Sequence, residues 1–301
     1  MKRLKNSIIK IWHLLKETGK SFIDDNAFKL SAALSYYTIF SLPPLLIIII
    51  SLSGVFFGTD AVNGEIFGQI NGLVGNDVAL QIQETIKNVR LSEASVFAST
   101  VGVIVLLVSA SFIFTEIQGS INYIWGIEAK PKRSIIKFLY NRLTSFLMIG
   151  LVGILLLAGL IINTLLNILN EQLGTIFPYE AVILFNLLNV FVIFIIIALL
   201  FIIIFKTLPD GKIAIRDCIV GAAFTSFLFM IGKFAIGFYL GNFNIGSIYG
   251  AAGSIILILA WVYYSAIILY FGAEFTKVYA ITHGQKIIPN SYSIKIKKYN
   301  T

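Results

Sequence analysis

Residues 181–205 read AVILFNLLNVFVIFIIIALLFIIIF and contain no charged side chain. About 20 apolar residues in a helix are enough to cross the hydrocarbon core of a bilayer. A helix that is apolar around its whole circumference is typical of a membrane span, because a soluble surface helix keeps a polar face. The whole chain has 57% hydrophobic and 13% charged residues, against roughly 25% charged in soluble domains. The sequence therefore predicts a membrane protein.

Five further segments have the same character, so we predict an all-α, polytopic membrane protein with six transmembrane helices. The expected spans are 27–57, 97–125, 138–166, 181–205, 218–240 and 249–275, with an outside loop at 58–96. Together they form one transmembrane domain, residues 27–276. A basic amphipathic helix is expected in the cytoplasmic segment 1–26, with a partly disordered segment as the alternative, and residues 277–301 form a basic cytoplasmic tail.

The basic residues predict the orientation of these spans. With the N-terminus inside, the inner segments hold 20 of the 23 Lys and Arg residues, and only Lys87 and Arg90 lie outside, with Lys233 within a span. Lys and Arg are retained on the cytoplasmic side of membrane proteins. We therefore expect both termini in the cytoplasm. The same distribution explains the net charge of +8 without nucleic acid as a partner.

Three charged residues fall within the expected spans: Glu116, Lys233 and Glu274. Such residues usually face the bundle interior or a water-filled cavity, because charge in a membrane is costly. Lys233 and Glu274 have an alternative, in which their side chains reach the nearer interface. A contact between Lys233 and Glu116 stays open. Ser109 and Ser120 extend the Glu116 face by helical spacing. We predict that this face lines a polar cavity, with a neutral Glu116 hydrogen-bonded between helices as the alternative.

The first span carries a polar stripe followed by a break. Ser31, Ser35 and Thr38 recur at one helix face, Tyr37 lies beside them, and Pro43–Pro44 should kink or end the helix. Broken helices in transporters expose backbone groups to a central cavity, whereas a purely structural kink is the alternative. Glycines in the last two spans predict close helix packing; they are Gly237, Gly241, Gly246, Gly250 and Gly253.

Four blocks of sequence resemble the YihY/virulence factor BrkB family over about residues 10–280. The blocks are DNAFKLSAALSYYTIFSLPPLLIIII (25–50), INYIWGIEAKPK (121–132), LPDGKIAIRDCIVGAAFTSFLFMIGKFAIGFYL (208–240) and IYGAAGSIILILAWVYYSAIILYFGAEFTKV (248–278). The motif positions of the family correspond here to Ala32, Ala33, Tyr36, Tyr37, Ser41, Pro44, Trp125, Pro131, Pro209, Gly221, Tyr249, Gly250, Gly272, Ala273 and Glu274.

The resemblance implies a six-span bacterial inner-membrane protein without a settled biochemical activity. Some members of the family carry the old label ribonuclease BN, and roles in lipid or ion movement are suspected for others. We therefore interpret the chain as transport-like, with a non-transporting scaffold in envelope assembly as the alternative. Membrane lipids, an unknown substrate and, as an open alternative, a second copy of the chain are the expected partners.

The ribonuclease reading is disfavoured by the residues themselves. Hydrolytic nucleases commonly hold metal ions with clustered His, Asp and Glu, but His13 and His283 both lie in the tails. Asp24–Asp25 stands where it would cap the first helix. We predict no enzyme activity, no catalytic residues, no metal site and no cofactor.

Overall fold

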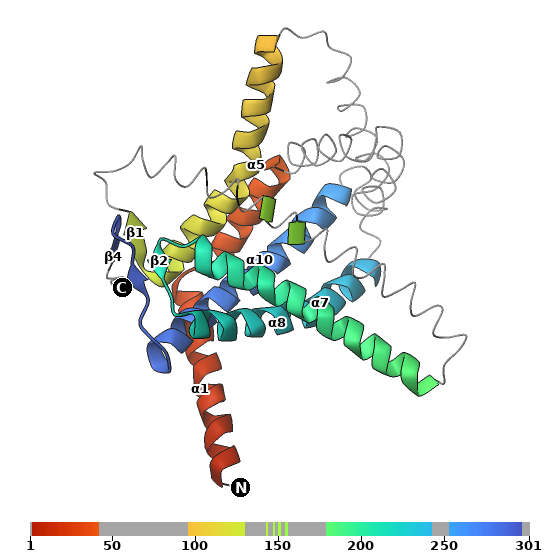
Figure 1. Ribbon diagram of the computed structural model, residues 1–301, viewed down its shortest axis with the longest axis vertical. Coiled ribbons are helices and arrows are strands. Elements are labelled where there is room, and N and C mark those ends of the chain that lie inside the picture. The colour runs from red at the N-terminus through yellow and green to blue at the C-terminus, as the bar shows by residue number, and fades with distance from the viewer. Residues whose placement is uncertain are drawn as a thin grey trace. The chain divides into compact units, whose positions relative to one another are not determined.

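The computed structural model (Figure 1) describes residues 2–41, 96–129, 179–242 and 253–296, with a few positions between 143 and 155. Its long helices are α1 (Lys2–Asp24), α5 (Val96–Trp125), α7 (Tyr179–Thr207), α8 (Ile215–Asn242) and α10 (Gly253–Thr282). Residues 27–41 are also helical. The chain divides into two compact units. The first unit comprises 1–27, 118–232 and 268–301, and the second unit comprises 28–117 and 233–267.

Four of these helices cover predicted spans. α5 and α7 match their predicted bounds closely, and α8 begins slightly before its own. α10 continues to Thr282, beyond the predicted end at 275. Among the residues that the structure describes, three runs are long and apolar enough to cross a membrane: Leu187–Thr207, Ile215–Lys233 and Ile258–Thr282. The total of six spans stays a prediction, because 42–95 and most of 130–178 lie outside the described residues.

Four short strands, which the sequence analysis did not predict, complete the first unit. β1 (Ile127–Ala129) pairs with β4 (Ser293–Lys295), and β2 (Gly211–Lys212) pairs with β3 (Ile288–Pro289), both antiparallel. Gly126 ends α5 with a φ of 67°, a conformation that glycine adopts without strain. The expected tail therefore begins as the end of α10, and its strands β3 and β4 pair with the loops that follow α7 and α5.

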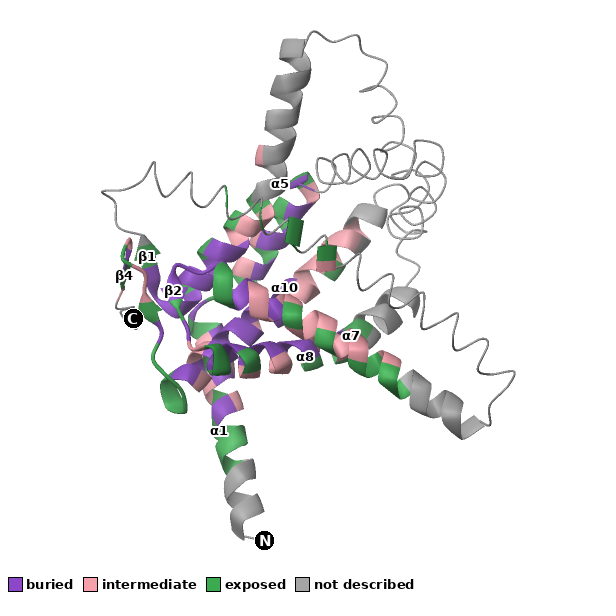
Figure 2. Cartoon of the chain, viewed as in Figure 1, coloured by how far each residue is buried: buried purple, intermediate pink, exposed green. Residues whose placement is uncertain are grey.

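The N-terminal helix α1 is amphipathic, as predicted. Its buried face carries Leu14, Thr18 and Phe22, whereas Trp12 and the three lysines at 10, 16 and 20 are exposed. Leu14 packs with Phe275 and Val278 of α10. Figure 2 shows this division: the N-terminal half of α1 is exposed where it is described, whereas buried residues lie in the later turns of α1, in the last turns of α5 and along α8 and α10.

Helices α8 and α10 meet through two glycines. A methyl group added at Gly221 would lie 1.9 Å from the hydroxyl of Thr276, and one at Gly272 would lie 2.0 Å from the hydroxyl of Thr225. Each threonine hydroxyl donates a hydrogen bond to the glycine carbonyl four residues earlier in its own helix. We call these four residues the Gly/Thr interlock. Because small residues let backbones approach closely, the interlock fixes α8 against α10.

Candidate functional site

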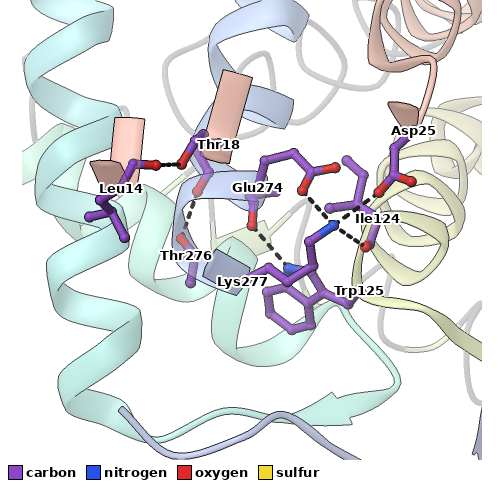
Figure 3. Close-up of polar contacts among 10 residues, drawn as sticks. Leu14, Thr18, Asp25, Ile124, Trp125, Glu274, Thr276 and Lys277 are labelled. Carbon is purple, nitrogen blue, oxygen red and sulfur yellow. Dashed lines mark hydrogen bonds and ion pairs between the residues drawn. The ribbon is translucent and has the colours of Figure 1, made fainter. Parts of the chain in front are cut away.

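Beside the interlock, α10 carries a buried ionic cluster (Figure 3). The ammonium group of Lys277 lies 3.0 Å from Oδ2 of Asp25 and 2.6 Å from Oε2 of Glu274. It also donates a hydrogen bond of 3.0 Å to the carbonyl of Ile124. We call these four residues the Lys277 cluster. It joins the turn after α1, the last turn of α5 and the C-terminal part of α10.

The local chain explains how these groups converge. Glu274 and Lys277 are three residues apart, so they lie on the same side of α10. Asp25 stands in the turn that follows α1, and the next residue, Asn26, has a φ of 51°. Ile124 belongs to the last turn of α5, where carbonyls lack partners within the helix. The indole of Trp125 adds a contact by donating a 3.1 Å hydrogen bond to the carbonyl of Ala273.

The cluster is buried. Glu274 has no solvent exposure, and the side chains of Asp25 and Lys277 are 8% and 16% exposed. Two carboxyl groups lie around one ammonium group. Removing charges from water is expensive, and apolar residues of the same size often stabilise a protein equally well. Stability alone therefore does not explain why this position is ionic.

A second polar cluster, centred on Asp210, lies in the same unit. The Asp210 carboxylate accepts hydrogen bonds from Gln118 at 3.2 Å and Asn122 at 2.9 Å, one turn apart on α5. Its backbone N–H donates to Asn122, and its carbonyl accepts from Ser293 and from the N–H of Asn290. We call this set the Asp210 junction. The partners of Asp210 lie on α5 and beside the C-terminal strands. The junction therefore holds the α7–α8 loop between α5 and these strands.

The predicted polar stripe is buried in the second unit. Ser31, Ser35 and Thr38 all have exposures below 9%, whereas Tyr37 is exposed. Ser35 and Thr38 donate to carbonyls of their own helix, at Ala32 and Leu34. These hydroxyls are therefore satisfied locally. Whether the stripe borders a cavity stays a prediction, and Pro43–Pro44 lie outside the described residues.

The other predicted residues are distributed along α5, α8 and α10. Glu116 is half-buried, Ser120 is buried and Lys233 is exposed. Glu274 is buried in the interior of the first unit. Ser109 lies on α5, but the structure does not describe its side chain. Gly237, Gly241 and Gly253 lie in helices whose surroundings at these positions are not described. Gly246 and Gly250 lie outside the described residues.

Sequence reasoning missed several residues of this site. Asp25 was expected to cap a helix, and Lys277 was expected to be a charge of the tail. Instead, Lys277 forms ion pairs with both Glu274 and Asp25. The i, i+3 spacing of Glu274 and Lys277 was a signal that could have linked them. Gly221 and Gly272 appeared only as motif positions of the resemblance, because their partners are threonines and not glycines.

The fold and the buried cluster together define an α-helical membrane protein with ionic contacts inside its helix bundle. The model of the family described as "Virulence factor BrkB" matches residues 18–293, and the chain belongs to this family.

Curated relatives agree with that assignment. Each is described as a "UPF0761 membrane protein". The relative from Saccharophagus degradans is 27% identical over 87% of this chain and 58% of its own length. One from Pseudomonas aeruginosa is 27% identical over 84% of the chain and 59% of its own length. One from Xanthomonas campestris pv. campestris is 28% identical over 85% and 58%. The chain thus spans somewhat less than two thirds of these relatives. No solved structure matches it.

Proposed function

We propose that the chain moves a lipid or a small solute or ion across the bacterial cell membrane, with the Lys277 cluster as a contact that opens and closes. The observation that carries this proposal is the fully buried Glu274, whose ammonium partner also binds Asp25, 252 residues away in the sequence. Ionisable residues inside a membrane domain commonly mark transport pathways. Ionic contacts can exchange partners while the helices that carry them keep their shape.

Reconstituted liposomes test the proposal with two probes. Lipid movement is followed by dithionite quenching of a fluorescent phosphatidylethanolamine, and ion movement by a potential-sensitive dye under a potassium gradient. We expect the wild type to accelerate one of the two over protein-free liposomes. Glu274→Gln, which keeps the shape but not the charge, should change that rate about tenfold or more. Glu128→Gln is the matched control, because Glu128 is exposed on β1.

Equal rates in protein-free, wild-type and Glu274→Gln liposomes for both probes would remove the transport proposal. The scaffold alternative would then be preferred. A wild-type rate that neither variant changes would show transport that does not depend on the cluster.

We further propose that the chain is not an enzyme. Within the described ranges, no three His, Cys, Asp or Glu side chains stand close enough together to hold a metal ion. His13 and His283 are both exposed. Purified protein should not cleave a transfer RNA precursor above a detergent blank, and metal-dependent cleavage that copurifies with the protein would contradict this.

The orientation with both ends in the cytoplasm is also a proposal, supported by the distribution of Lys and Arg. The inner-membrane location is a proposal that rests on the family. A cysteine at Asn76 should react with an impermeant thiol reagent in intact cells. A cysteine at Lys295, which is exposed on β4, should react only after the cells are opened. The native Cys218 is buried and gives a low background. The reverse labelling pattern would invert the orientation.

A further inference from the structure

We propose that the N-terminal half of α1 binds an anionic lipid surface. Its apolar side chains enter the headgroup region, and its lysines contact the lipid phosphates. The inference goes beyond the proposed function, because it assigns a partner to a surface of the first unit that lies outside the Lys277 cluster.

The first support is an apolar face of α1 that α10 covers only in part. Leu14 packs with Val278, and the ring of Phe22 lies against that of Phe271 with centroids 5.6 Å apart. The two helices therefore run in opposite directions along their contact. α10 ends at Thr282, one turn after Val278, so the earlier turns of α1 extend beyond the end of α10.

The same face of α1 continues beyond this contact and is exposed there. Ile11 stands three residues before Leu14 and seven before Thr18, so it lies on their side of the helix. Its side chain is 58% exposed, and that of the neighbouring Trp12 is 70% exposed. Ile281, close to the end of α10, is exposed as well. Both helices thus present apolar side chains where their contact ends.

The second support is the charge of α1. Its 23 residues include six basic and two acidic side chains. Lys10, Lys16 and Lys20 are exposed, and Lys16 follows Trp12 by one turn. A basic helix with tryptophan on its apolar face is typical of helices that lie in the plane of a membrane interface, where an indole ring is favoured. The charge complements a surface of anionic lipids.

The position of α1 makes lipid the source of that negative charge. α1 packs on the last turns of Ile258–Thr282, a run long and apolar enough to cross a membrane. Val278, the partner of Leu14, stands four residues before the end of this run. The exposed face of α1 is therefore held near the level at which α10 leaves the hydrocarbon core. A binding partner in the same membrane has a high effective concentration there.

The test uses the full chain in lipid nanodiscs, with Cys218 replaced by Ala and one nitroxide label at a time on a new cysteine. Ile11→Cys reports on the exposed apolar face. His13→Cys is the matched control, because His13 is also exposed and two residues along a helix point to opposite sides. Collisions of the label with oxygen, which partitions into lipid, and with a nickel chelate, which stays in water, measure immersion.

Two lipid compositions are compared, phosphatidylcholine alone and equal parts of phosphatidylcholine and phosphatidylglycerol. In the anionic discs, we expect the ratio of oxygen to nickel collisions to be several-fold higher at Ile11 than at His13. In phosphatidylcholine alone, the ratio at Ile11 should fall towards that at His13. Each lysine near an anionic surface contributes about fivefold to binding, so the anionic lipid decides whether the helix stays bound.

Two triple variants with the same loss of charge separate α1 from the rest of the chain. Gln at Lys10, Lys16 and Lys20 should lower binding about a hundredfold and return the Ile11 label to water in the anionic discs. Gln at three other exposed lysines should leave that label immersed; these are Lys212, Lys286 and Lys295.

Three results would overturn the inference. The first is a label at Ile11 that is in water in both lipid compositions. The second is a label that is immersed equally in both, or that ignores the loss of the α1 lysines, because the contact would then not require anionic lipid. The third is a label shielded from both oxygen and nickel, because a protein surface such as a second copy of the chain would then cover this face.

Discussion

Helix α10 is held on two sides by contacts of opposite kinds. On one side, Gly272 and Thr276 interlock with Gly221 and Thr225 of α8, and Phe275 stacks on Phe224 with ring centroids 3.9 Å apart. On the other side, charged and polar groups contact Asp25 and the end of α5. The first contact depends on shape and has one geometry. The second depends on charge and can be exchanged for water or an ion.

From this difference we infer that one contact of α10 is fixed and the other can open within the first unit. Tightly packed interiors change little without a large loss of free energy, so α8 and α10 should behave as one body. The Lys277 cluster, by contrast, should be the place where the segment around Asp25 separates from that body. The predictions below test each side of the comparison.

The largest effect is expected at the Gly/Thr interlock. Gly221→Leu places a side chain where even a methyl group would lie 1.9 Å from the Thr276 hydroxyl. Overpacking of this kind costs about 3 kcal/mol or more, so we expect no folded protein in detergent-solubilised membranes, measured by size-exclusion chromatography with fluorescence detection.

The matched control is Gly119→Leu, because an added side chain at Gly119 on α5 meets nothing within 4 Å. This variant should elute like the wild type. Normal elution of Gly221→Leu would show that α8 and α10 can separate. It would contradict the claim that the Gly/Thr interlock fixes α8 against α10.

A smaller loss is expected at the Asp210 junction. Asp210→Ala leaves the buried amides of Gln118 and Asn122 without their shared acceptor. A buried donor without a partner costs about 1–3 kcal/mol, so the midpoint of thermal unfolding should fall by several degrees. Asp24→Ala, at an exposed position, should leave the midpoint unchanged. A similar midpoint for Asp210→Ala and the wild type would show that the junction does not hold α5.

The smallest effect is expected for Trp125→Phe. It removes the hydrogen bond from the indole to the Ala273 carbonyl and keeps an aromatic ring. We expect a loss of about 1 kcal/mol in the free energy of unfolding. Trp12→Phe, at an exposed position on α1, should change it by less than about 0.5 kcal/mol. Equal stabilities for these two variants would remove Trp125 from the contact between α5 and α10.

The membrane character and the helices of this chain could be predicted from the sequence for a physical reason. Runs such as 181–205 carry no charged side chain, and Lys and Arg are kept out of such runs because charge is costly inside a membrane. The helix ends were less predictable. α10 continues past Phe275 to Thr282, and the contacts of Lys277 inside the protein are not visible to hydropathy alone.

The site was harder to predict, because its residues are distant in sequence. Glu274 was singled out as a charge within a span, but Asp25 is 249 residues away from it by number, and its role depends on a tertiary contact. The Asp210 junction depends on the folding of residues 287–296 into strands. Their composition resembles that of a basic tail, and their pairing partners are loops that carry no strand signal of their own.

The comparison is tested most directly by distances between spin labels on cysteine pairs, with Cys218 replaced by Ala. One pair, Ile23 and Ile281, reports on the segment beside Asp25 relative to α10, and the other, Ile219 and Ile281, reports on α8 relative to α10. All three positions are exposed. Introducing Asp25→Asn together with Glu274→Gln should broaden or lengthen the first distance by about 5 Å and leave the second narrow. Two distances that both stay fixed, or that both change, would contradict the account.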